Sequence, residues 1–281
     1  MLHILMRFPG GKAKALTLSY DDGVQQDQKL MQIMKQSGLK GTFNLNSGRY
    51  AVEGTVFPAG KVYRRLTEKQ AIELYTDSGQ EVAVHTNTHP FLEKLPSYLV
   101  MEELIKDREI LERQFHTIIR GMAYPFGTFN DEVVDCVKKS GIVYARTTIS
   151  SHSFKMPVDW LRLEPTCHHD DEKLMELAQQ FVEGGPASER EPWLFYLWGH
   201  SFEFEQKNNW EVIENFAAYI GGKEDIWYAT NLEICDYVQA YKQLQFSVAG
   251  ERVYNPTVTD IYFTKDGKDY CVKSGDTIEL E

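Results

Sequence analysis

The stretch Ala15-Leu16-Thr17-Leu18-Ser19-Tyr20-Asp21-Asp22-Gly23 decides the fold. Its apolar, alternating start has the pattern of a buried β-strand. The two carboxylates of Asp21 and Asp22 therefore leave the strand at its carboxyl end, where Gly23 lets the chain turn away sharply. Adjacent carboxylates seldom ionise together unless a cation or separate hydrogen bonds hold each one. The stretch thus predicts a division of labour, in which one carboxylate binds a metal ion and the other acts as a base.

A second stretch, His85-Thr86-Asn87-Thr88-His89, follows the apolar run Glu81–Val84, which also predicts a strand. Its two histidines are four residues apart, so a single helical turn would place both imidazoles on one side. Together with Asp22 they form a set of two imidazoles and one carboxylate, which leaves coordination positions open for water and substrate. Asp-Asp-Gly alone is often a turn, and a histidine pair is often a helix surface. Because both stretches end predicted strands, we favour the metal site.

These two stretches resemble the first two signatures of the polysaccharide deacetylases, the chitin and peptidoglycan deacetylase group with the nodulation-protein-B homology domain. Tyr20-Asp21-Asp22-Gly23 is similar to the first signature and His85–His89 to the second. The resemblance extends over about residues 15–205. It implies a divalent ion, zinc in many members, that Asp22, His85 and His89 hold, and it implies Asp21 as the base that takes a proton from water.

The third signature of the family, Arg-x-Pro-Tyr-Gly, is similar to residues 121–127. Phe126 takes the place of the tyrosine whose backbone N–H holds the oxyanion, a role that needs only the main chain. Ala123, however, falls where the family has an arginine that orients the catalytic aspartate. Arg146, which ends the next predicted strand, is our candidate replacement, and a surface arginine is the alternative. Arg120 and Arg162 are weaker candidates.

Two further signatures are shorter. Pro157-Val158-Asp159-Trp160 resembles the fourth, in which the acid, here Asp159, tunes the catalytic histidine and the indole lines the pocket. A core tryptophan beside a capping aspartate is the alternative. The apolar run Trp193–Gly199 has the pattern of a buried strand that delivers His200 to the same mouth. It resembles the fifth signature, with Trp198 at the expected leucine, and it implies that His200 protonates the leaving amine.

Another cluster, Cys167-His168-His169-Asp170-Asp171, could also bind a metal ion. An amphipathic helix is predicted from Glu172 to Val182 directly after it. Asp170 or Asp171 would serve as the cap of that helix. We therefore expect a helix start here and no second metal site.

Strands alternate with helices along the chain, which predicts a parallel sheet with its functional loops at the carboxyl ends of the strands. Together with the resemblance, this predicts an α/β fold, a distorted, seven-stranded, TIM-like (β/α) barrel, over residues 1–245. From residue 246 to 281 short alternating strands follow, with Asp266-Gly267 as a hairpin signal. This part has few apolar residues, so we expect a C-terminal β extension that packs on the barrel.

The composition narrows the class of partner. The net charge of −11 argues against nucleic acid and anionic membranes as main partners. Four scattered cysteines indicate neither disulfides nor a zinc-cysteine cluster. No leader is visible at residues 1–9 and no membrane span is predicted, which favours a cytoplasmic protein with a small substrate or an exported one whose leader is absent. The sequence predicts no oligomeric state.

The resemblance implies removal of an acetyl group from an N-acetylated poly- or oligosaccharide by metal-activated water. Two alternatives remain open. The protein could hydrolyse a small non-sugar amide or cyclic imide on the same fold. It could also be a non-catalytic carbohydrate-binding protein, in which the missing arginine at Ala123 marks lost chemistry.

Overall fold

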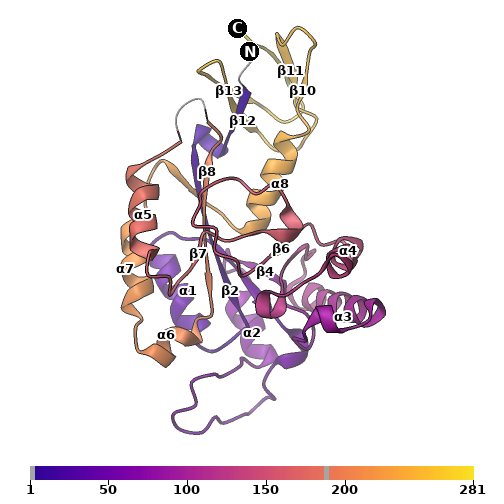
Figure 1. Ribbon diagram of the computed structural model, residues 1–281, viewed down its shortest axis with the longest axis vertical. Helices are drawn as coiled ribbons and strands as arrows, with labels where there is room; N and C mark the ends of the chain where they lie inside the picture. Colours follow the sequence, from indigo (N-terminus) through magenta and orange to yellow (C-terminus); the bar gives the residue numbers. More distant parts are fainter. Residues whose placement is uncertain (1–3, 187–189) are drawn as a thin grey trace.

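A curled sheet of parallel strands forms the centre of the molecule (Figure 1). The computed structural model describes residues 4–186 and 190–281. Residues 1–3, which belong to the N-terminal stretch 1–9 where no leader is visible, lie outside the described part. Seven strands lie in the order β6-β5-β4-β3-β2-β8-β7. An eighth strand, β9, pairs with the first residues of β2, whereas β3 pairs with the last residues of β2 along the same side of that strand. Their bounds are β2 (Lys14–Asp21), β3 (Gly41–Leu45), β4 (Glu81–Val84), β5 (Gly121–Ala123), β6 (Tyr144–Arg146), β7 (Cys167–His168), β8 (Trp193–Gly199) and β9 (Ile226–Tyr228).

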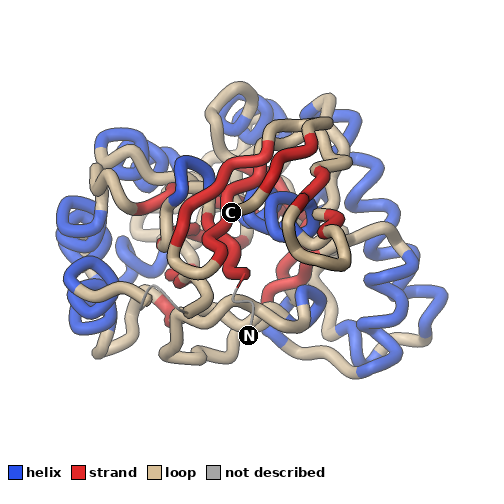
Figure 2. The backbone as a smooth tube through the Cα atoms, turned by 90° about the horizontal axis from the view of Figure 1, so that it is seen from above, coloured by secondary structure: helices blue, strands red, loops and turns tan. Residues whose placement is uncertain are grey.

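Helices surround this sheet, as the view from above shows (Figure 2). They are α1 (Asp27–Gln36), α2 (Glu68–Tyr75), α3 (Ser97–Phe115), α4 (Asp131–Lys139), α5 (Leu174–Glu183), α6 (Phe202–Lys207), α7 (Glu211–Ile220) and α8 (Asn231–Tyr241). Thr67 caps α2, because its side chain accepts a hydrogen bond from the Gln70 backbone in a capping box. Among the described residues, every helix is too short or too polar to span a lipid bilayer.

The start of α5 differs from the prediction. The helix begins at Leu174, two residues later than predicted, with Lys173 as its N-cap residue. The Asp171 carboxylate accepts a hydrogen bond of 2.9 Å from the Lys173 backbone N–H, so the expected aspartate does satisfy a backbone donor at the helix start. Asp170 pairs instead with Lys207, and Asp171 lies 2.6 Å from Nε2 of His152. Both carboxylates therefore form contacts with basic side chains, Lys207 and His152, that the sequence pattern did not predict.

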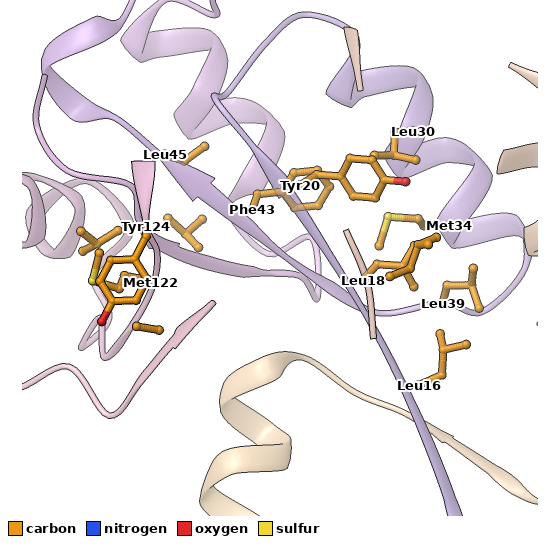
Figure 3. Close-up of a cluster of buried hydrophobic side chains, with 14 of the residues drawn as sticks. Leu16, Leu18, Tyr20, Leu30, Met34, Leu39, Phe43, Leu45, Met122 and Tyr124 are labelled. Carbon is orange, nitrogen blue, oxygen red and sulfur yellow. The ribbon is translucent and has the colours of Figure 1, made fainter. Parts of the chain in front are cut away.

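The strand β2 is buried along its whole length, because helices or neighbouring strands cover both of its faces. Leu16, Leu18 and Tyr20 lie in one hydrophobic cluster with Leu30 and Met34 of α1 (Figure 3). Complete burial of such a side chain contributes about 1.5–3 kcal/mol to folding. The strand that carries Asp21 is therefore among the most firmly held parts of the fold.

The C-terminal strands form two small antiparallel sheets at the end of the molecule opposite the long loop of residues 50–66 (Figure 1). They are β10 (Gln245–Phe246), β11 (Arg252–Tyr254), β12 (Ile261–Lys265), β13 (Lys268–Val272) and β14 (Thr277–Glu279). The predicted hairpin at Asp266-Gly267 is confirmed, with left-handed φ angles of 50° and 85°. Sequence patterns did not reveal β1 (Ile4–Arg7), which pairs with β12, so the two ends of the chain share one sheet. The boundary at residue 245 stays a prediction.

Candidate metal centre and active site

Six of the side chains selected from the sequence converge at the carboxyl end of the sheet. Because the strands are parallel, β2, β4, β6 and β8 all end at this edge. These strands bring together residues that lie up to 179 positions apart in the chain. The six residues are Asp21, Asp22, His85, His89, Arg146 and His200.

The candidate metal ligands are Asp22, His85 and His89. One donor atom from each lies within 4.8 Å of the others. Nδ1 of His85 lies 2.8 Å from the backbone oxygen of Ala123, so this nitrogen carries the proton and Nε2 keeps its lone pair for the site. Burial lowers the pKa of His85 and lowers that of His89 to about 4, so both rings are neutral near pH 7. The donor set therefore fits a divalent ion.

The histidine stretch is not the helical turn that its spacing predicted. It is a loop in which Thr86 and His89 have left-handed φ angles of 65° and 61°. The Thr86 hydroxyl accepts a hydrogen bond of 3.1 Å from the His89 backbone, and Asn46 donates to the Thr86 carbonyl over 2.9 Å. These bonds hold a conformation that non-glycine residues seldom adopt, and the two imidazole centroids meet at 4.7 Å.

Asp21 lies beside this set and is paired with Arg146. The Arg146 guanidinium donates to Oδ2 of Asp21, and Asn44 donates to Oδ1 over 2.8 Å. Arg146 is 0% exposed and lies over the Trp198 ring at 4.4 Å. Burial alone would raise the pKa of Asp21, but Arg146, His85 and His200 outweigh burial and lower it. The expected contact between Arg146 and Asp21 is thus present, whereas Arg120 pairs with Asp236 and Arg162 with Asp159 and Asp131.

His200 lies on the other side of Asp21, with Nε2 3.9 Å from Oδ2. Its neighbouring carboxylate is that of Glu203, which accepts from the His200 backbone over 3.3 Å and lies 3.5 Å from Nδ1. Burial lowers the pKa of His200, but Glu203, Asp21 and Asp22 together raise it above its ordinary value. The imidazole is therefore biased towards its protonated form.

The structure does not bring Asp159 to His200. Asp159 is exposed, pairs with Arg162 at 2.7 Å, and accepts from the Leu161 backbone at the start of a 3-10 turn. Trp160 is buried in a separate hydrophobic cluster. These contacts agree with the alternative prediction, in which Trp160 is a core residue beside an aspartate that caps a turn. Glu203, which comes from the short helix α6 rather than from a motif, occupies the position next to His200.

Phe126 lies at the rim of the site. Its φ angle of 58° is left-handed, its ring meets His89 at 4.4 Å, and half of the side chain is exposed. Phe91 stacks on it with centroids 3.8 Å apart. The mouth therefore has an exposed aromatic edge next to a candidate metal ligand.

Arg65 is a buried neighbour of the candidate site that no sequence pattern indicated. It follows the long loop and donates to Oδ1 of Asp22 over 2.9 Å, to the Asp22 carbonyl, and to Asn46 over 2.8 Å. Burial would raise the pKa of Asp22, but Arg65 and the site histidines lower it. An isolated arginine after a loop has no periodicity to reveal such a role.

Residues 9–145 match the family model for polysaccharide deacetylase. Over these residues, 137 of the 281, the chain is similar to the polysaccharide deacetylase family. The matched part includes Asp21, Asp22, His85, His89 and Phe126, whereas Arg146 and His200 lie beyond it. The protein YxkH of Bacillus subtilis (strain 168), which is named as a polysaccharide deacetylase, is 25% identical over 139 residues. That match spans 48% of this chain and 45% of YxkH, so the chain covers less than half of the relative's length.

Two solved structures share the fold of this chain. A polysaccharide deacetylase from Mycobacterium smegmatis is 15% identical with a TM-score of 0.57, and the match covers 85% of this chain and 94% of that one. A family 4 carbohydrate esterase from Streptomyces lividans, solved in complex with acetate, is 16% identical with a TM-score of 0.51, covering 78% and 93%. At these identities the similarity concerns the fold alone, and the predicted fold class is confirmed.

Proposed function

We propose that this protein is a divalent-metal-dependent deacetylase that hydrolyses the amide of an N-acetylated sugar. The observation that carries the proposal is the set of three metal donors beside an aspartate that a buried arginine keeps ionised. An ion held by Asp22, His85 and His89, zinc or another divalent metal, would polarise the acetamide carbonyl and lower the pKa of a water molecule.

The chain's own residues then divide the proton transfers. Asp21, kept ionised by Arg146 and fixed by Asn44, accepts a proton from the attacking water. His200, whose pKa is raised, donates a proton to the leaving amine from the other side of Asp21. The backbone N–H of Phe126 would donate to the carbonyl oxygen as it gains charge. The rings of Phe126 and Phe91 offer an apolar surface for a sugar next to His89.

Acetate release from a panel of N-acetylated glycans, with and without a chelator, tests this function. We expect release that the chelator abolishes and that zinc or another divalent ion restores. Release of acetate that the chelator does not change would contradict the metal dependence. No release from any glycan, with hydrolysis of a small cyclic amide, would favour the non-sugar alternative, and loss of both activities with retained glycan binding would favour a binding protein.

The metal ligands can be tested by His89→Ala. Because this change removes one of three donors, we expect the variant to bind one divalent ion fewer per chain than the wild type by elemental analysis, and to lose activity. His116→Ala is a matched control, since His116 is exposed at the end of α3. A His89→Ala protein with the full wild-type metal content would contradict the assignment of His89 as a metal ligand.

The pH dependence tests Glu203. Because Glu203 raises the pKa of His200 and the general acid works only when protonated, activity should fall as pH rises through that raised pKa. In Glu203→Gln the negative charge is absent, so the alkaline limb of the pH profile should move to lower pH by about one unit. Glu205→Gln on the same helix is the control, because Glu205 pairs with Arg64. An unmoved alkaline limb in Glu203→Gln would exclude the proposed role.

A further inference from the structure

A second group of metal donors lies outside the set of Asp22, His85 and His89. His168 at the end of β7, the two residues that follow it, and Glu203 of α6 each place one donor atom within 4.8 Å of the others, and the group is His168, His169, Asp170 and Glu203. No step of the proposed hydrolysis uses the first three of these residues.

The spacing of the donor atoms suits coordination to a common ion. Oε2 of Glu203 lies 3.2 Å from Nε2 of His168 and 3.1 Å from Nε2 of His169, and the latter lies 3.6 Å from Oδ2 of Asp170. Around a tetrahedral zinc ion with bonds of about 2.0–2.1 Å, neighbouring donors are about 3.3 Å apart. These three of the six separations among the four donors are close to those around a tetrahedral zinc ion, and the others lie within 4.8 Å.

His169 supplies an independent observation. Its side chain is 0% exposed, and neither ring nitrogen makes a hydrogen bond of acceptable geometry within the described residues, although the Glu203 carboxylate lies 3.1 Å from Nε2. The hydration that burial removes from this imidazole is therefore only partly replaced. Burial also lowers the pKa of His169, so the ring is neutral and its lone pair is available. A metal ion at Nε2 would supply the missing partner.

We propose that His168, His169, Asp170 and Glu203 bind a second divalent transition metal ion, with zinc as the expected occupant. Two imidazoles and two carboxylates suit zinc better than calcium or magnesium, which prefer oxygen donors alone. The proposal does not depend on the deacetylase activity, because it concerns metal binding by the chain.

Two contacts compete with the ion and make this site the weaker one. The Lys207 ammonium pairs with Asp170, although about half of the lysine side chain is exposed and free to move away. The Asp170 backbone N–H donates to Nδ1 of His168 over 3.1 Å, which places the proton of neutral His168 on Nε2. Metal binding must displace the lysine and move this proton.

Calorimetric titration of the chelator-stripped full chain with zinc tests the proposal. We expect two zinc ions per wild-type chain, one in His89→Ala, one in His168→Gln or Asp170→Asn, and none in the combination of His89→Ala with His168→Gln. Lys207→Met should tighten the second binding event by about two- to fivefold, because it removes the competing ammonium.

The location is checked by anomalous diffraction from zinc-containing crystals, with a peak expected among the four side chains. Circular dichroism identifies any variant that does not fold, and Asp170→Asn, at a partly exposed position, is the mildest of them. One zinc ion in the wild type at saturation, or two ions that persist in both His168→Gln and Asp170→Asn, would overturn the proposal. Neither result would affect the first site, which His89→Ala reports separately.

Discussion

Asp21→Asn is expected to keep its metal ion and to lose deacetylation by about a hundredfold or more. An amide has nearly the shape of the carboxylate, and its single oxygen can still accept a hydrogen bond from Arg146 or from Asn44, but it cannot take a proton from water. The donor atoms assigned to the ion come from Asp22, His85 and His89, and none is removed. Steady-state kinetics and elemental analysis of the same preparation measure the two effects.

Asp22→Asn provides the comparison for this experiment. It changes the neighbouring carboxylate, so it should lower metal content as well as rate. If Asp21→Asn and Asp22→Asn lose the ion equally, the two aspartates share the coordination and the division of labour between them is wrong.

Arg146→Met is expected to have the largest effect on stability. Asp21 would then be buried without its cation, and loss of one partner of a buried pair costs about 3–5 kcal/mol in the free energy of unfolding. Arg146 lowers the pKa of Asp21, so in the wild type the pair contributes stability above the unfolded pKa of about 3.9, and this is lost as pH falls through the folded pKa. The deficit of the variant should therefore be largest near neutral pH and shrink in acid.

The same change should alter catalysis in a recognisable way. Because Asp21 would become harder to ionise, the acidic limb of the pH profile should move to higher pH while metal content stays constant. Arg120→Met is the control, since Arg120 pairs with Asp236 at the surface and should cost less than about 1 kcal/mol. Equal stability losses in the two variants, by chemical denaturation, would contradict a buried structural pair.

Local patterns were sufficient to predict most of the sheet and its helices. The strand β2 begins with alternating apolar residues and β8 is a continuous apolar run, and both were predicted as strands. Arg146 could be found because all strands of a parallel sheet end at one edge, so a charged residue at a strand end points to the mouth. The candidate metal ligands Asp22, His85 and His89 were selected by the same reasoning.

The parts of the fold and of the candidate site that were not predicted depend on contacts between segments far apart in the sequence. Glu203 reaches His200 through the short helix α6, and Arg65 follows a long loop without periodicity. The four-residue spacing of His85 and His89 fits a helical turn equally well, and only the surrounding hydrogen bonds select the loop. β1 is four residues long and forms only because β12, more than 250 positions later, provides its partner.

The left-handed backbone at the mouth has a consequence for the protein's tolerance of change. Asp22, Thr86, His89 and Phe126 all have positive φ angles, and each such residue costs roughly 1–3 kcal/mol. The summed conformational cost of these four residues is large compared with a typical net stability of about 5–15 kcal/mol. The protein thus gives up stability to keep the mouth in one conformation before any ligand binds. Laboratory selection for heat resistance alone should therefore favour substitutions that relieve the positive φ angles at these positions, and the more stable variants should hold the loop that carries His89 less well.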